Sequence, residues 1–237
     1  MIIAQTVSFD GAVGCPLCNI ELAFLVDSST KTNSNAWTQM LNFVSDVVRQ
    51  YDIRSNCVRA AVIRYSNSAD APIQLNFYSN VNQLVQAIAR IQFLGGSSNL
   101  AAALDLLRSQ VFASNIVRGN TAQIAIIVTD QLQSRSQIQN AANNVKSQGI
   151  TVIAVGVTRP NRVDTNFLYS ITSNRWAIPV GDYSQLVSSA RELIVRQYGC
   201  FPFTTTTTAP LPTSPRMFMF TRSVYLKHYL CIFLLSS

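Results

Sequence analysis

Charged residues are scarce in this sequence, and so are glycine and histidine. Charged residues make up 12% of the 237 positions, about half of the usual share of roughly 25%, so the net charge of +7 is a small excess within a sparse set. Only nine glycines occur, which excludes a collagen-like repeat. No run of about 18 uncharged apolar residues is present, and this excludes a polytopic membrane protein.

The shortage of histidine narrows the possible chemistry. The one histidine is His228, near the C-terminus, so the rest of the chain cannot form a Ser-His-Asp triad. Neither a G-x-G-x-x-G nor a P-loop pattern follows a strand, so nucleotide phosphates would lack their cradle. Arg49, Arg54, Arg59 and Arg64 lie on different predicted elements, and we interpret them as a solvated surface rather than a nucleic-acid-binding stripe. We therefore expect neither an enzyme nor a nucleic-acid-binding protein.

The chain has five cysteines, at positions 15, 18, 57, 200 and 231. Cys15 and Cys18 form a C-x-x-C pair, but zinc would need two further ligands at matching spacing. Cys18 and Cys200 bracket the regular part of the chain, so we take them as disulfide candidates; an odd number of cysteines leaves the pairing open. Disulfides indicate an oxidising, extracellular setting, although Met1–Val13 lacks the basic region of a secretory signal.

Apolar periodicity alternates between strand and helix from Ile20 to Tyr198, which predicts a doubly wound α/β fold. The sheet should be mostly parallel, with one antiparallel edge strand and helices on both faces. The pattern predicts strands at Ile20–Val26, Val58–Tyr65, Ile73–Phe77 (the edge strand), Ile124–Val128, Ile150–Val155 and Trp176–Val180, and helices at Ala36–Tyr51, Val81–Ile91, from Asn99 onward, Ser136–Ser147 and Leu186–Ile194.

Composition divides the chain into four regions, namely an N-terminal segment (1–19), a domain (20–200), a Thr/Pro-rich linker (201–216) and a tail (217–237). Before Cys200 there are 15 basic and 11 acidic residues, and the linker and tail together add three basic residues and no acidic one. The net charge is thus spread over both regions and is no signature of nucleic-acid binding. The apolar tail is interrupted by Arg222 and Lys227, so we do not expect it to anchor the protein in a membrane.

Polar residues gather where the predicted strands end. Asp27-Ser28-Ser29 follows the first strand, Asp130 follows the fourth, and the segment 95–99 (Gly-Gly-Ser-Ser-Asn) leads into a helix. The carboxyl ends of parallel strands form the ligand-binding edge of such a sheet. Mg²⁺ prefers oxygen ligands, which the hydroxyls of Ser29 and Ser98 and the carboxylates of Asp27 and Asp130 could supply. A position left open on the ion could accept a carboxylate from another protein.

These features resemble the von Willebrand factor type A domain family. The resemblance covers Ile20 to Tyr198 and includes Val62-Ile63-Arg64-Tyr65-Ser66 and Val152-Ile153-Ala154-Val155-Gly156-Val157 on two strands. It implies a metal-ion-dependent adhesion site (MIDAS), built from an Asp-x-Ser-x-Ser turn, a Thr in the glycine loop and an Asp after the fourth core strand. Asp27, Ser29 and Asp130 match that pattern, and Ser98 takes the place of the Thr.

Two positions depart from the family pattern. Lys31 stands where the second Ser is expected, which removes an oxygen ligand and introduces a cation that cannot coordinate a metal. Gln131 replaces the usual Gly after Asp130. Lys31 could swing outward and leave a weakened Mg²⁺ site, or its ammonium could pair with Asp27 or Asp130 and replace the ion. We favour the metal-free alternative.

The resemblance implies extracellular protein–protein recognition, as an adhesion or matrix-binding module that is not an enzyme. We expect an extracellular or matrix protein to bind around Lys31, Ser97, Asn99 and Gln131, with Lys31 attracting an acidic group. Two alternatives remain open at this stage. One is a hydrolase or transferase on a flavodoxin-like sheet that uses Ser29 and the carboxylates, and the other is a purely structural spacer in a matrix protein.

Overall fold

The fold was analysed in a computed structural model that describes residues 19–29, 34–158 and 163–186. The chain divides into two units, Met1–Pro202 and Phe203–Ser237, and all described residues belong to the first. None of the helices within the described ranges has the length and apolarity that a membrane crossing requires.

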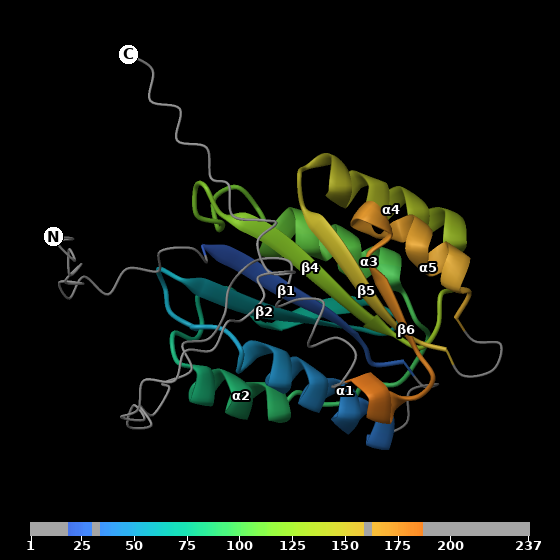
Figure 1. Cartoon of the computed structure of the whole chain (residues 1–237), viewed down its shortest axis with the longest axis horizontal. Helices are drawn as coiled ribbons and strands as arrows, with labels where there is room; N and C mark the ends of the chain where they lie inside the picture. The colour runs from blue at the N-terminus through green and yellow to red at the C-terminus, as the bar shows by residue number, and fades with distance from the viewer. Residues whose placement is uncertain (1–18, 30–33, 159–162, 187–237) are drawn as a thin grey trace, which may run out of the picture. The chain divides into compact units, whose positions relative to one another are not determined.

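Six strands form one mixed sheet in the order β3-β2-β1-β4-β5-β6 (Figure 1). All neighbouring pairs are parallel except β2 and β3, which run antiparallel at the edge. This confirms the predicted fold class. The strands are β1 (Ile20–Asp27), β2 (Val58–Tyr65), β3 (Ala69–Ile73), β4 (Ala122–Thr129), β5 (Thr151–Val157) and β6 (Ala177–Val180).

The edge strand lies earlier in the sequence than its alternating pattern predicted. β3 ends at Ile73, and the residues after it form a turn in which Leu75 is fully buried and Phe77 is 57% exposed. The alternation of apolar and polar residues from Ile73 to Phe77 therefore reflects a turn with one inward side chain. The strand β3 is short, and it pairs with only the last half of β2.

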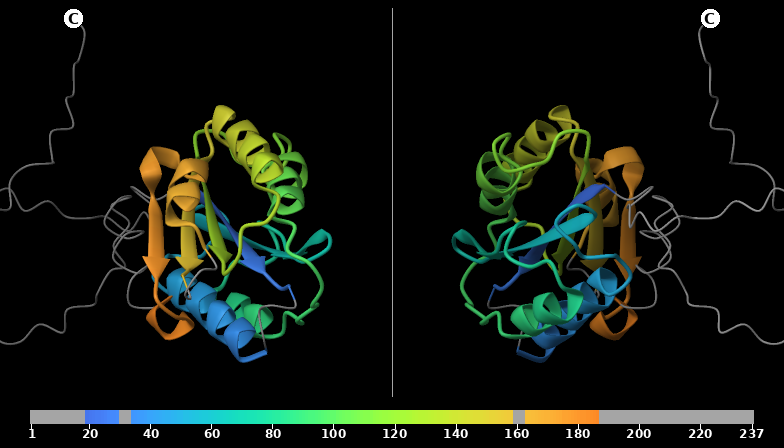
Figure 2. Two further views of the ribbon diagram at one scale, coloured as in Figure 1. Left: turned by 90° about the vertical axis from the view of Figure 1, so that its right-hand side faces the viewer. Right: turned by 90° about the vertical axis from the view of Figure 1, so that its left-hand side faces the viewer.

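Helices cover both faces of the sheet (Figures 1 and 2). One face carries α1 and α2, and the other carries α3, α4 and α5. The helices are α1 (Ser34–Val48), α2 (Val81–Ala89), α3 (Leu100–Leu106) continued by the π-helical turn η1 (Leu107–Val111), α4 (Arg135–Ser147), α5 (Thr165–Ile171) and the 3₁₀ turns η2 (Ser173–Arg175) and η3 (Tyr183–Gln185). The helix α5 was not predicted from the sequence, and most of the predicted helix Leu186–Ile194 lies outside the described residues.

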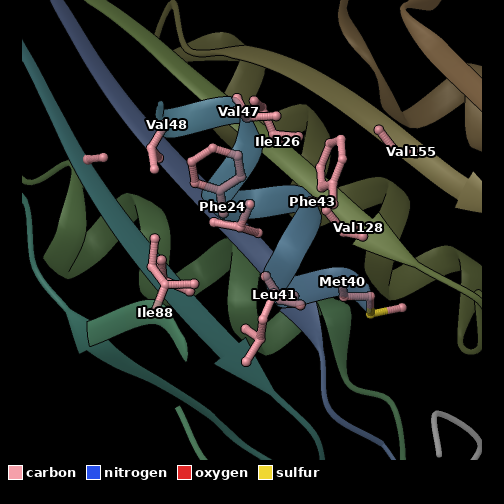
Figure 3. Packing of buried hydrophobic residues seen from close by; sticks show 14 of the residues in the cluster. Phe24, Met40, Leu41, Phe43, Val47, Val48, Ile88, Ile126, Val128 and Val155 are labelled. Atoms are coloured by element: carbon pink, nitrogen blue, oxygen red, sulfur yellow. The ribbon is translucent and has the colours of Figure 1, made fainter. Parts of the chain in front are cut away.

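Two apolar cores result from the alternation of side chains along the central strand β1, which is buried throughout. Phe24 points to the face covered by α1, where it packs among Phe43, Val47 and residues of β4 (Figure 3). Leu25 points to the opposite face and belongs to the core beneath α3 and α4. Trp37 of α1 is buried, and its indole N–H donates to the carbonyl of Ile91. The sheet is thereby fixed from both sides.

A buried ion cluster secures the start of β1. Glu21 is fully buried, and its carboxylate accepts hydrogen bonds from the guanidinium groups of Arg59 and Arg118, with shortest N–O distances of 2.7 Å for each. Arg118 also donates to the carbonyls of Ser55, Ile20 and Cys57. The interpretation of the arginines as a solvated surface is thus wrong for Arg59 and also for Arg64, because their side chains are only 11% and 14% exposed. The cluster joins β1, β2 and the segment before β4 at the end of the sheet opposite the polar loops.

We expect Glu21→Gln to destabilise the domain by about 3 kcal/mol, because the substitution leaves two partly buried arginines without their common carboxylate. The matched control is Arg135→Gln, which removes an ion pair with Asp164 whose side chains are 57% and 36% exposed. That change should cost at most about 1 kcal/mol. Urea unfolding of both variants measures the difference. Equal losses in the two variants would contradict the structural importance of the Glu21 cluster.

Candidate metal and partner site at the top of the sheet

The carboxyl ends of the parallel strands meet at one edge of the sheet, which we call the top face. β1 ends at Asp27 and β4 at Thr129, and the register of the two strands pairs Val26 with Val128. Asp27 and Thr129 are therefore neighbours, and Thr129 donates a hydrogen bond from its Oγ1 to Oδ2 of Asp27 at 3.2 Å. The predicted polar residues do come together at this edge.

Asp27 is the centre of this arrangement. Its side chain is fully buried, and it accepts hydrogen bonds from three different segments. The backbone N–H of Ser29 donates to Oδ1 at 2.9 Å, and the hydroxyl of Ser98 donates to Oδ2 at 2.8 Å. With Thr129, these donors tie the loop after β1, the glycine loop before α3 and the end of β4 to one carboxylate.

Ser28 strengthens the link between β1 and the glycine loop. Its Oγ accepts from the backbone N–H of Leu94 at 2.8 Å, and its carbonyl accepts from the N–H of Gly95 at 2.9 Å. The same residue donates its own backbone N–H to the carbonyl of Tyr65, at the end of β2. Ser28 is therefore a structural residue that holds the loop, rather than a ligand that faces outward.

The two glycines are required by the path of this loop. Gly95 and Gly96 have φ angles of +73° and +91°, in the region that favours glycine. A Cβ on Gly96 would lie 2.9 Å from side-chain atoms of Asn67. That close approach lets the side-chain oxygen of Asn67 accept from the backbone N–H of Ser97 at 2.7 Å. The backbone carbonyl of Asn67 accepts from the side-chain amide of Asn99 at 3.3 Å. Asn67 thus orders the exposed rim of the top face.

Asp130 lies next to Asp27 but has a different principal partner. It is fully buried, and its Oδ2 accepts a hydrogen bond of 2.6 Å from the hydroxyl of Tyr183 in η3. The charge of Asp130 acts on Asp27 at short range and disfavours ionisation of Asp27. Two buried carboxylates therefore share the site, as the sequence predicted.

Gln131 is buried within the site. We expected it to contact a partner, but it is only 4% exposed, and its side-chain amide donates to the hydroxyl of Ser29. The carbonyl end of the same amide accepts from the side chain of Gln133 at 2.9 Å. The backbone N–H of Gln131 donates to Thr129, whose hydroxyl contacts Asp27. Gln131 is thus part of the hydrogen-bond network around the carboxylates.

Burial dominates the acidity of Asp27. Removal from water disfavours the charged form and raises the pKa of Asp27 from 3.8 to about 6. Hydrogen bonds from the hydroxyls of Ser29 and Ser98 and from the backbone N–H of Ser29 act in the opposite direction, and the charge of Asp130 adds to the increase. Because the described donors to Asp27 are all neutral, they offset only part of the cost of burying the charge.

The four predicted metal-ligating residues, Asp27, Ser29, Ser98 and Asp130, gather at the top face, but as arranged they do not fit a divalent cation. The hydroxyl of Ser29 accepts from the amide of Gln131, which offers N–H groups where an ion needs oxygen lone pairs. Lys31, at the position of the fifth ligand, lies outside the described residues. The oxygen donors are therefore satisfied by one another and by Gln131.

The remaining site predictions have mixed outcomes. Ser97 is exposed and Asn99 half-buried at the rim, where Asn99 also caps α3 by accepting from the N–H of Ala102. Cys18 and Cys200 lie outside the described residues, so their pairing stays a prediction. Cys57, which the sequence did not single out, is fully buried and disulfide-bonded.

Sequence reasoning missed three residues that shape the site. Thr129 directly precedes Asp130, and Asn67 closely follows β2, so their positions at strand ends were available as signals. Tyr183 lies 53 residues after Asp130 and carries no such signal. A tertiary contact of this kind becomes visible only once the chain is folded.

A small hollow opens beside Ser98 at the top face, with a volume of about 240 Å³. Its wall consists of exposed or half-buried polar side chains and three apolar residues of α3 and α4. The lining residues include Asn67, Ser97, Asn99, Gln133, Gln137 and Ile138. The hollow is smaller than the roughly 300–1,000 Å³ that is usual for small-molecule sites. Its uncharged donors and acceptors suit hydrogen bonds to a protein surface.

Comparison with known proteins identifies relatives. The family model of the von Willebrand factor type A domain matches residues 21–191. The chain is 32% identical over 158 residues to matrilin-3 of Mus musculus and 30% identical over 142 residues to the collagen alpha-6(VI) chain of Homo sapiens. These alignments cover 64% and 60% of this chain, but only 33% and 6% of the respective relatives. The chain thus corresponds to a part of these larger proteins.

Solved structures support the fold. Proximal thread matrix protein 1 from the mussel byssus superimposes with a TM-score of 0.70 at 19% identity, covering 77% of this chain and 48% of that one. A second structure of that protein, with a zinc-occupied MIDAS motif, gives a TM-score of 0.66 at 21% identity and covers 74% of this chain and 44% of that one. At these identities the likeness establishes a shared fold, and the zinc belongs to the mussel protein.

The raised pKa of Asp27 predicts a dependence of stability on pH. Because Asp27 holds its proton more tightly in the folded state, the raised pKa contributes stability that is fully present below the ordinary pKa of 3.8. This stability is lost as the pH rises through about 6, where the folded protein releases the proton. In chelator-treated protein, we expect the unfolding free energy of the wild type to fall by about 3 kcal/mol relative to Asp27→Asn between about pH 4 and pH 7. Urea unfolding across this range measures the difference, and a constant gap between the two proteins would contradict the burial argument.

Proposed function

The chain belongs to the von Willebrand factor type A domain family, and from this premise we propose that it is an extracellular, non-enzymatic module that recognises a matrix protein through its top face. The family assignment covers most of the domain. The named relatives include collagen chains and matrilin-3, and the mussel protein is a thread matrix protein. Because the chain spans only part of each, their assemblies and partners are not carried over to it.

The observation that carries the proposal is the ordered polar rim around the hollow beside Ser98. Asn67 fixes the backbone of Ser97 and accepts the amide of Asn99, so the rim is held in place before any partner arrives. Preorganised hydrogen-bonding groups lower the entropic cost of association. Since the residues lining the hollow are uncharged, we infer that shape and hydrogen bonds determine recognition on this part of the face.

We also propose that the partner contributes an acidic group, which Lys31 contacts. Lys31 follows Ser29 by two positions and lies outside the described residues. We retain it as the candidate contact for a carboxylate, on its charge and its place in the sequence alone. Mg²⁺ is given no role in this contact, because the amide of Gln131 donates to the hydroxyl of Ser29, one of the oxygens that an ion would need.

A hydrolase or transferase finds little support at the top face. Such an enzyme would need a deep apolar pocket near Ser29 and the carboxylates. The hollow in this part of the described structure is small and lined mainly by amides and hydroxyls. Recognition of a protein surface needs no deep pocket, and amides and hydroxyls of this kind can form hydrogen bonds with such a surface.

We expect Gln137→Arg to abolish partner binding. Gln137 is an exposed residue of α4 that lines the hollow, and an arginine would fill it and add a charge. In a pull-down from an extracellular matrix extract, the variant should retain at most about a tenth of the protein that the wild type retains, since a loss of about 1.4 kcal/mol is tenfold in affinity.

The matched control is Asn144→Arg, an exposed position on α4 two turns further along the helix. It makes a similar change about 10 Å away and should leave retention unaltered. Equal losses in the two variants would move the interface away from the hollow. A wild-type protein that retains nothing in this assay would instead favour the structural spacer.

A further inference from the structure

The side chain of Gln131 lies inside the site, in contact with a predicted metal ligand. The residue follows Asp130 at the end of β4 and is 4% exposed. Its amide nitrogen donates to the hydroxyl of Ser29, one of the predicted metal ligands. A side chain that the sequence places on the outer surface is therefore directed inward, onto the oxygen donors.

Three further contacts hold Gln131 in this orientation. The side chain of Gln133 donates to its amide oxygen at 2.9 Å, which leaves the amide nitrogen to face Ser29. Its backbone N–H donates to the hydroxyl of Thr129 at 3.2 Å, and its carbonyl oxygen lies 2.7 Å from that hydroxyl, whose single proton it shares with Asp27. Thr129 in turn contacts Asp27. Gln131 is thus connected to the network around the buried carboxylate through its amide nitrogen, which contacts Ser29, and through its backbone, which contacts Thr129.

An amide N–H group and a divalent cation compete for the same atom. The Ser29 hydroxyl has two lone pairs, and the amide of Gln131 uses one; a cation at the other would lie beside amide N–H groups that carry partial positive charge. By contrast, the hydrogen bond from Ser98 to Asp27 is no obstacle, because a hydroxyl can direct its proton to a carboxylate and a lone pair elsewhere. Among the described residues, Gln131 is therefore the group that opposes an ion at these oxygens most directly.

We propose that Gln131 is an internal plug that closes this site to divalent cations, so that the top face is ordered by an amide in place of a metal. The inference deepens the proposed function, in that the partner would meet a surface whose order does not depend on a cation. It predicts that shortening this one side chain opens a cation site built from Asp27, Ser29, Ser98 and Asp130.

The test is calorimetric titration of the full chain with MnCl₂. Gln131→Ala removes the amide, and since the backbone of Gln131 has no positive φ, alanine fits there. Gln131→Asn is a second variant, because its amide is one methylene shorter and would no longer reach Ser29. We expect both variants to bind Mn²⁺ at least tenfold more tightly than the wild type. The double variant Asp27→Asn/Gln131→Ala should lose that binding.

Gln137→Ala is the matched control, since it shortens a glutamine that lines the neighbouring hollow and does not contact Ser29. It should bind Mn²⁺ as the wild type does. Equal Mn²⁺ affinity in the wild type and both Gln131 variants, whether tight or immeasurable, would overturn the plug. The titration involves no partner, so this failure is distinct from a failure of the pull-down, and urea midpoints of each variant establish that it is folded.

Discussion

The top face depends on one buried carboxylate. Asp27 ends the central strand of the sheet, and its two oxygens accept hydrogen bonds from Ser29, Ser98 and Thr129, which belong to three separate segments. Because a buried charge must find partners, each of these loops is drawn to the same point. The rim at Ser97 and Asn99 flanks Ser98, which this buried network holds, and Asn67 orders the rim further through its own hydrogen bonds.

The two ends of β1 solve the same electrostatic problem in different ways. At one end, two arginines surround Glu21 and join β1 to β2 and to the segment before β4. At the other, Asp27 has only neutral described donors, and burial raises its pKa to about 6. The first arrangement is that of a fixed structural joint. The second leaves charge imperfectly compensated, as is common where a protein binds ions or partners.

The sequence was sufficient to predict the fold and the place of the site. Continuous apolar runs such as Ile124–Val128 indicated strands buried on both faces, and aspartates at the ends of two such strands indicated the binding edge. The edge strand was misplaced because its alternating residues form a turn, and α5 was missed because only Leu168 and Ile171 of its seven residues are buried.

Side-chain direction at the site was beyond the reach of the sequence. Gln131 was expected to face a partner, but it turns inward because Gln133, Thr129 and Ser29 together satisfy its polar groups. Tyr183 reaches Asp130 from a segment far along the chain. Such contacts depend on which polar groups the folded chain leaves to be satisfied, and periodicity carries no information on this.

In our proposal Gln131, and not a cation, completes the network around Asp27. The most direct measurement is a crystal structure of the protein grown with millimolar MnCl₂, with anomalous diffraction used to locate manganese. We predict no anomalous peak among Asp27, Ser29 and Ser98, and we expect the amide of Gln131 to donate a hydrogen bond to the hydroxyl of Ser29. A manganese ion bound to the Ser29 and Ser98 hydroxyls, with Gln131 turned away, would contradict it.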